Sequence, residues 1–163
     1  MNRILCRIAL ALAGALVAAG ALAAMPKQPT LVVPTLDGKS FDLSAQRGKW
    51  VVVNFWATWC SPCIKEMPDI SKFVESRQDV RAIGIAFGGE EREDVVAFLA
   101  KHPVKYPVAN VPLDKPPGQF DPPKGLPTTY LISPTGDVAK KFTGPVTSGD
   151  LEKAIAAGSS KKS

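Results

Sequence analysis

The chain of 163 residues has the length of one domain, and with 45% hydrophobic and 21% charged residues it has the composition of a globular rather than a disordered protein. Its formal net charge of +5 falls to +3 without Arg3 and Arg7, which lie in a segment that we expect to be removed. The rest of the chain has no dense run of lysine or arginine, so nucleic acid is not an expected partner.

The N-terminal segment has the pattern of a secretory signal peptide. Positive residues lead, an apolar run rich in Ala and Leu follows, and small residues close it at Ala23 and Ala24. The alternative is an uncleaved membrane anchor, but the run is short and rich in Ala and Gly for a spanning helix. We therefore divide the chain into a signal peptide over 1–24, a folded domain over 25–158 and a flexible tail over 159–163.

The folded domain is predicted to begin with a hairpin over 31–43, because Asp37-Gly38 is a strong turn signal between apolar stretches. The β-branched run from Trp50 to Trp56 indicates a strand buried on both faces. A helix is expected from about Ser61 to Arg77, since Pro62 is tolerated in a first helical turn. The further predicted elements are a buried strand over 80–87, a helix over 90–101, strands over 128–132 and 138–143, and a last helix capped by Ser148 that ends near Ala157.

The segment 102–125 contains seven prolines, and we expect an irregular loop there rather than a helix. A helix that joins two strands implies a parallel, right-handed crossover, and the turn between the last two strands adds an antiparallel pair. The predicted fold class is therefore α/β, with a mixed central sheet, helices on both of its faces and an N-terminal β-hairpin extension.

Loss of the signal peptide would remove Cys6 and leave Cys60 and Cys63 as the cysteines of the mature chain. A structural disulfide framework uses several cysteines at wider spacing, and so small a loop restricts the unfolded chain little. A closed structural zinc site needs four ligands, whereas the mature chain adds only His102, which we expect to be a loop residue. The pair therefore indicates redox chemistry, and neither a metal nor a cofactor is expected.

Cys60 is predicted to lie where a strand ends and a helix begins. Free backbone amides and the positive end of the helix dipole favour a thiolate there, so the pKa of its thiol should fall below the free value of about 8.5. Cys63, one turn further in, should be less exposed and have the higher thiol pKa. Because the thiolate is the attacking species, we expect Cys60 to attack a substrate disulfide and Cys63 to resolve the mixed disulfide.

Two stretches carry a resemblance to a known family. The segment 51–68 reads VVVNFWATWCSPCIKEMP, and the segment 125–130 reads GLPTTY. Both are similar to the signatures of thioredoxin-like proteins of the TlpA/ResA type, which are periplasmic or membrane-anchored thiol–disulfide oxidoreductases of bacteria. The resemblance extends from about Leu31 to Ala157. It implies the thioredoxin fold, a periplasmic location and dithiol–disulfide exchange without a cofactor.

The resemblance implies that Pro127 is the cis-proline beside the cysteine pair. Leu126 could then pair its backbone with an extended substrate strand. Without the family match, an ordinary turn proline in a proline-rich region is an equally good interpretation. Trp59 directly precedes Cys60, and we expect it to belong to the apolar surface where a partner docks, with simple packing as the alternative.

Glu66 lies one helical turn beyond Cys63, so the two can share a helix face. In the family this acid lies near the cysteines and helps to move the proton of the resolving thiol, which a partly desolvated carboxylate with a raised pKa can do. From spacing alone, a solvated helix glutamate is the simpler interpretation. Asn54 stands where thioredoxin itself has a buried acid, which leaves Glu66 as the candidate base of the motif.

The predicted function is the reduction of protein disulfides by a periplasmic monomer. The resemblance implies apocytochromes c or copper-site assembly proteins as clients and a membrane electron carrier as the reductant, although the residues do not determine the direction of exchange. An alternative is a copper chaperone on the same fold, but such chaperones use wider cysteine spacing. A thiol peroxidase is less favoured, because Ala57 occupies the threonine position of the Thr-x-x-Cys arrangement. The proline-rich segment 111–124 replaces a helix of the family and is either a partner-selecting loop or a spacer.

Overall fold

The computed structural model describes residues 26–115 and 117–160. The predicted signal peptide and the last three residues of the predicted tail lie outside these ranges. None of the helices within them has both the length and the apolar character needed to cross a bilayer.

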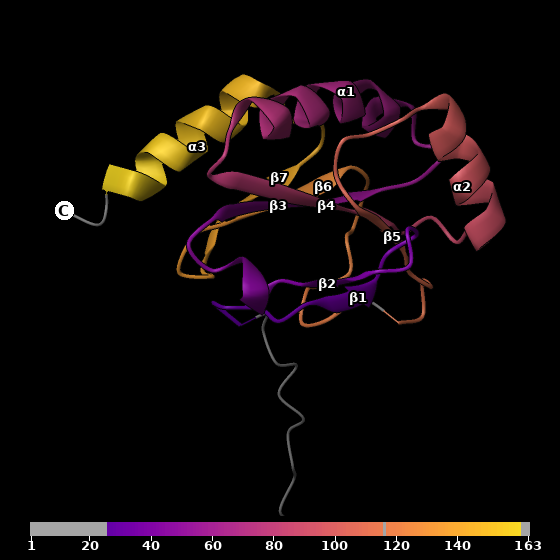
Figure 1. Ribbon diagram of the computed structural model, residues 1–163, viewed down its shortest axis with the longest axis horizontal. Helices are drawn as coiled ribbons and strands as arrows, with labels where there is room; N and C mark the ends of the chain where they lie inside the picture. The colour runs from indigo at the N-terminus through magenta and orange to yellow at the C-terminus, as the bar shows by residue number, and fades with distance from the viewer. Residues whose placement is uncertain (1–25, 116, 161–163) are drawn as a thin grey trace, which may run out of the picture.

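The centre of the fold is a five-stranded mixed sheet (Figure 1). In chain order its strands are β3 (Trp50–Trp56), β4 (Val80–Ala86), β5 (Val108–Asn110), β6 (Thr128–Ile132) and β7 (Val138–Thr143). Across the sheet they lie in the order β5-β4-β3-β6-β7. The pairs β3–β4 and β4–β5 are parallel, whereas β3–β6 and β6–β7 are antiparallel. The mixed sheet predicted from the order of elements is therefore confirmed.

The N-terminal hairpin is also confirmed. Strands β1 (Val32–Pro34) and β2 (Ser40–Asp42) pair antiparallel, with Val33 opposite Phe41. Gly38 takes a φ of 83° in the turn, a conformation that favours glycine. A short 3-10 turn, η1 (Ser44–Gln46), follows the hairpin.

Three helices lie in the described ranges: α1 (Ser61–Ser76), α2 (Arg92–Lys101) and α3 (Ser148–Ser160). Neighbouring side chains of a strand point to opposite faces, so the sheet separates two cores. In the first core, Val52 and Trp56 of β3 pack with Met67 of α1, Val95 of α2 and Leu151 of α3. All three helices therefore contribute to the same face of the sheet.

The expectation of helices on both faces needs correction. The second core joins Val51 and Phe55 of β3 to Leu31 and Leu43 beside the hairpin and to Phe120 of the proline-rich loop. From β3 to β4 to β5 the chain moves twice in the same direction across the sheet, and two right-handed crossovers then place both helices on one face. The return from β5 to β6 crosses the opposite face as a loop, because its prolines cannot continue a helix.

Strand β5 and the bounds of α2 and α3 are the main departures from the predicted elements. Strand β5 lies inside the segment expected to be irregular, since three residues between prolines carry almost no strand signal. Helix α2 begins at Arg92, which leaves Glu90 outside it. Helix α3 continues to Ser160, because Gly158 has no side chain to collide with the ring of Trp50, where a Cβ would lie 2.6 Å from a ring carbon.

The cap of α3 is Thr147 rather than Ser148. The backbone N–H of Asp150 donates to the Thr147 hydroxyl at 3.2 Å, and the N–H of Thr147 donates back to the Asp150 carboxylate at 3.1 Å. This is the reciprocal pattern of a capping box. The N–H of Ser148 donates instead to the Asp69 carboxylate at 2.7 Å, which ties the start of α3 to α1.

Candidate active site

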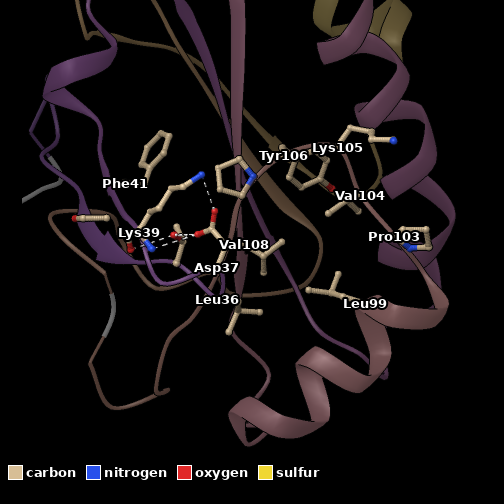
Figure 2. A pocket seen from close by; sticks show the side chains of 13 residues that line it. Leu36, Asp37, Lys39, Phe41, Leu99, Pro103, Val104, Lys105, Tyr106 and Val108 are labelled. Carbon is tan, nitrogen blue, oxygen red and sulfur yellow. Dashed lines mark hydrogen bonds and ion pairs between the residues drawn. The ribbon is translucent and has the colours of Figure 1, made fainter.

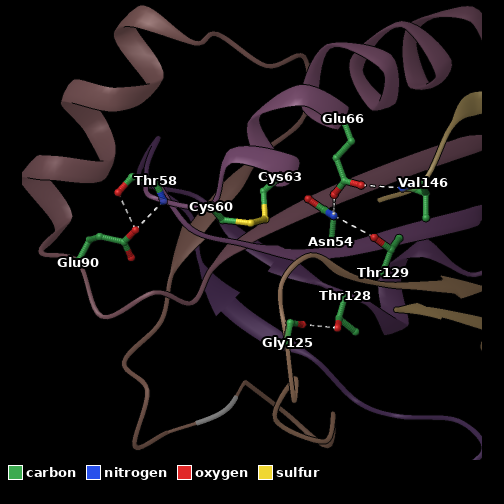
Figure 3. Close-up of a disulfide and its surroundings, with 10 residues drawn as sticks. All are labelled: Asn54, Thr58, Cys60, Cys63, Glu66, Glu90, Gly125, Thr128, Thr129 and Val146. Atoms are coloured by element: carbon green, nitrogen blue, oxygen red, sulfur yellow. Dashed lines mark hydrogen bonds between the residues drawn. A yellow bond between two sulfur atoms is a disulfide. The ribbon is translucent and has the colours of Figure 1, made fainter. Parts of the chain in front are cut away.

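Cys60 is the N-cap residue of α1, and Cys63 lies within the helix's first turn, as expected. Their sulfur atoms form a disulfide, and their Cα atoms are 5.3 Å apart (Figure 3). Cys60 is 4% exposed and Cys63 is completely buried, so Cys63 is the less accessible of the two, as predicted. Cys60 lies at the positive end of the α1 dipole, a position that stabilises a thiolate.

A tight turn connects β3 to Cys60, whose backbone N–H donates to the carbonyl of Ala57 at 3.1 Å. Trp59 lies within this turn and is 66% exposed. Its indole N–H donates to the carbonyl of Gly88, in the loop after β4, at 3.3 Å. Simple packing of Trp59 in the interior is therefore excluded, whereas Trp56 is fully buried.

Glu66 lies on the buried face of α1 and is only 4% exposed. One carboxylate oxygen accepts the side-chain N–H of Asn54 at 2.7 Å, and the other accepts the backbone N–H of Val146 at 2.8 Å. Burial raises the pKa of Glu66 from 4.5 to about 7, although both hydrogen bonds act to lower it. The solvated glutamate that spacing alone suggested is therefore wrong.

Asn54 connects Glu66 to the sheet (Figure 3). Its side chain is fully buried, and its amide nitrogen donates to Thr129 Oγ1 at 2.9 Å as well as to Glu66. Thr129 lies opposite Asn54 in the β3–β6 pairing. The signal for this arrangement is one amide side chain within the otherwise apolar run of β3. The sequence identifies Asn54 only as the replacement of an acid and does not predict its bond to Glu66.

The Leu126–Pro127 peptide bond is cis, as the resemblance implied. Thr128 follows directly and pairs with Phe55 near the end of β3, so the Leu126–Pro127 segment meets the end of the strand that leads to Cys60. Gly144 donates its backbone N–H to the carbonyl of Pro127 at 2.9 Å. Within the described residues, the backbone N–H and carbonyl of Leu126 make no hydrogen bond.

One acidic residue near the cysteines was not predicted as a site residue. Glu90 was expected to be the first residue of a helix, but it precedes α2 and its side chain points toward Thr58 (Figure 3). One oxygen of its carboxylate accepts the backbone N–H of Thr58 at 2.6 Å and the Thr58 hydroxyl at 2.8 Å. No spacing rule along the chain relates these two residues, which are 32 positions apart.

A cavity of about 560 Å³ lies away from the cysteines, between the hairpin and the segment that joins α2 to β5 (Figure 2). The N–H of Leu36 donates to the carbonyl of Val108 at 2.7 Å and so attaches the hairpin turn to β5. None of the predicted site residues lines this cavity. Within the described ranges, no group of three His, Cys, Asp or Glu side chains is arranged to hold a metal ion. His102 stacks on Phe98, with 4.4 Å between the ring centroids.

A C-x-x-C pair at the start of a helix, after the central strand of a mixed sheet and near a cis-proline, defines the thioredoxin class of disulfide-exchange proteins. The model of the AhpC/TSA family matches residues 26–142, and the chain belongs to this family. A thiol-disulfide oxidoreductase ResA of Bacillus cereus is 37% identical over 125 residues, which cover 76% of this chain and 72% of that protein. The resemblance to ResA-type proteins is thus confirmed.

Solved structures agree with this assignment. A thiol:disulfide interchange protein of the thioredoxin family from Chlorobium tepidum TLS aligns with a TM-score of 0.66 at 28% identity, covering 83% of this chain and 97% of that one. A DsbF homologue from Corynebacterium diphtheriae aligns with a TM-score of 0.71 at 25% identity, covering 79% and 84%. The protein is therefore a thiol:disulfide oxidoreductase with the thioredoxin fold.

Proposed function

We propose that the protein is exported to the periplasm and reduces protein disulfides there, with Cys60 as the attacking thiolate and Cys63 as the resolving thiol. The observation that carries this proposal is the buried Glu66 carboxyl, with a pKa of about 7, on the same helix face as the fully buried Cys63. A carboxyl with this pKa is half ionised at neutral pH and can accept a proton there.

The first step uses the position of Cys60. As the N-cap of α1 it has the helix amides and the positive end of the dipole behind it, and it is the more accessible of the two cysteines. The Cys60 thiolate attacks one sulfur of a substrate disulfide. A mixed disulfide forms between Cys60 and the substrate, and the other substrate sulfur leaves as a thiolate.

The second step uses Glu66. Cys63 is buried and cannot give its proton directly to water, so Glu66 accepts that proton. The Cys63 thiolate then attacks the Cys60 sulfur of the mixed disulfide and releases the second substrate thiolate. The Cys60–Cys63 disulfide closes, and the substrate has gained two electrons. A membrane electron carrier returns the pair to the dithiol state.

Trp59 and the Leu126–Pro127 segment are proposed to bind the substrate. The unbonded N–H and carbonyl of Leu126 can pair with the backbone of an extended chain, as in strand addition. The exposed Trp59 ring, next to Cys60 in the sequence, supplies an apolar contact. Apocytochromes c and copper-site assembly proteins are the proposed clients, on the basis of the TlpA/ResA resemblance and the predicted signal peptide.

Trapping of mixed disulfides in the exported compartment tests this mechanism. Cys63→Ala should accumulate mixed disulfides on Cys60, because no thiol remains to resolve them, and Cys60→Ala should trap none. The double variant serves as the control for nonspecific capture. The reverse pattern would exchange the roles of the two cysteines. N-terminal sequencing of the exported protein tests cleavage after Ala23 or Ala24.

The direction of exchange is tested by equilibrium with glutathione at neutral pH. We expect a potential in the reducing range, nearer to that of thioredoxin, about −270 mV, than to that of DsbA, about −120 mV. A value close to that of DsbA would contradict the reductase direction and leave thiol–disulfide exchange itself intact.

A further inference from the structure

The turn that carries Cys60 is held by the loop that follows β4. Strands β3 and β4 are parallel neighbours with Trp56 opposite Ala86, so the segments that leave their carboxyl ends lie side by side. Phe87 donates its backbone N–H to the carbonyl of Trp56 at 2.9 Å. The bond from the Trp59 indole to Gly88 adds a second contact between the two segments.

Glu90 makes the most specific of these contacts. In the turn from Ala57 to Cys60, the backbone N–H of Thr58 points away from the turn's own hydrogen bond and needs another acceptor. One Glu90 oxygen accepts both this N–H and the Thr58 hydroxyl. The Glu90 backbone is held in turn, because Asn110 of β5 donates its side-chain N–H to the Glu90 carbonyl at 2.9 Å.

Two features indicate that this carboxylate is closely fitted to the turn. A Cβ added to Gly88 would collide with the other Glu90 oxygen and with the methyl group of Ala57, so the close approach requires glycine there. That second oxygen is buried and has no hydrogen-bond partner within the described residues. An exposed carboxylate that merely lay on the surface would keep both oxygens in water.

We propose that Glu90 is a positioning residue for disulfide exchange, which holds the Ala57–Cys60 turn and places a negative charge beside the Cys60 thiolate. The inference rests on the proposed attack by Cys60. The ends of such a turn are less than 7 Å apart, so a carboxylate bonded to the amide of Thr58 lies within about 10 Å of the Cys60 sulfur. A like charge at this distance disfavours the thiolate.

The start of α1 and the buried titratable groups of the first core act in different ways. The amides at the start of α1 favour the thiolate, whereas Glu66, further along α1, adds negative charge when it is ionised. Burial raises the pKa of the hydroxyl of Tyr106, before β5, and the charge of Glu66 adds to this effect, so the hydroxyl stays neutral. The segment 126–129 has no titratable side chain. Glu90 thus opposes the helix dipole and makes the disulfide harder to reduce.

Glu90→Gln separates charge from geometry, because the amide oxygen of glutamine can still accept both Thr58 hydrogen bonds. The matched control is Glu91→Gln, which removes the same charge from the neighbouring, exposed position. The first measurement is the rate of Cys60 alkylation by iodoacetamide against pH, in the Cys63→Ala background. The second is the equilibrium of the intact dithiol with glutathione.

Glu90→Gln should lower the apparent pKa of Cys60 by about half a unit and raise the alkylation rate below that pKa about twofold, because the thiolate fraction rises about threefold while the nucleophilicity of the thiolate falls. The glutathione equilibrium should shift about threefold toward the dithiol, which corresponds to a potential about 14 mV less negative. Glu91→Gln should leave both unchanged. Equal effects of the two variants, or no effect of Glu90→Gln, would overturn the proposed effect of the Glu90 charge on Cys60. If Cys63→Ala instead traps no substrate on Cys60, the proposed mechanism fails, whatever Glu90 does.

Discussion

Replacement of Glu66 by glutamine tests the buried carboxyl through the stability of the protein. The pKa of Glu66 is about 7 in the folded protein and 4.5 in its reference state, so the folded chain binds this proton more tightly than the unfolded chain does. Between these two pH values the stability of the wild type therefore falls as pH rises. The difference between the two pKa values corresponds to about 3 kcal/mol, all of it lost above pH 7.

Urea unfolding of the oxidised protein at intervals from pH 4.5 to pH 8 measures this effect. The free energy of unfolding of Glu66→Gln should lack the decline, so its difference from wild type should change by about 3 kcal/mol across the window. Glu75→Gln is the matched control, because Glu75 lies on α1 with its side chain 53% exposed. Its curve should run parallel to that of wild type.

Parallel curves for wild type and Glu66→Gln, with a difference that changed by less than about 0.5 kcal/mol, would refute a raised pKa of Glu66 in the folded protein. The titration of other carboxyls does not alter the difference in unfolding free energy between the two proteins. Asp79, for example, has its pKa lowered by its hydrogen bond to Arg77 and titrates below the window in both proteins. The same variant should slow resolution of the mixed disulfide near neutral pH, because Cys63 loses its proton acceptor.

Four further substitutions test the packing around the sheet and the cap of α3. Phe120→Ala should lower the free energy of unfolding in urea by about 3 kcal/mol, because the ring is 3% exposed and its centroid lies 5.0 Å from that of Tyr130 and 6.1 Å from that of Phe55. A cost below about 1 kcal/mol would mean that the loop does not hold the second core. Tyr106→Phe removes a buried hydroxyl that has no hydrogen-bond partner in the described residues, so the melting temperature should stay unchanged or rise. A clear decrease in the melting temperature would show that this hydroxyl makes a stabilising hydrogen bond. Thr147→Ala should lower the free energy of unfolding by about 1 kcal/mol, because α3 loses its N-cap, and Ser148→Ala should lower it less. Equal costs would contradict the assignment of Thr147 as the N-cap.

Local signals in the sequence were sufficient for most of the fold. Asp37-Gly38 placed the hairpin turn, and the apolar runs of β3 and β4 placed the two central strands. The C-x-x-C motif at a strand-to-helix junction located Cys60 and Cys63. Each of these signals depends on residues that are close in sequence, where turn geometry and side-chain alternation act directly.

The features that were missed depend on the direction in which the chain crosses the sheet. Whether α2 lies on the face of α1 follows from β5 being beside β4, and β5 has only three residues between prolines. Without a predicted β5, the sequence does not show where the second crossover ends, and α2 on either face of the sheet agrees with the predicted order of elements. The loop that covers the second core was similarly hidden, because burial of Phe120 depends on where that crossover returns.

The two acids near the cysteines differ in the same way. Glu66 shares α1 with Cys63, so helical spacing and a family motif together indicate it from the sequence. Glu90 reaches Thr58 only because β3 and β4 are parallel and in register, which brings the loops at their carboxyl ends together. In this fold the residue after a neighbouring parallel strand can therefore act on the nucleophile as directly as one on the nucleophile's own helix. Groups that can tune Cys60 are thus placed by the order of the strands as well as by the motif.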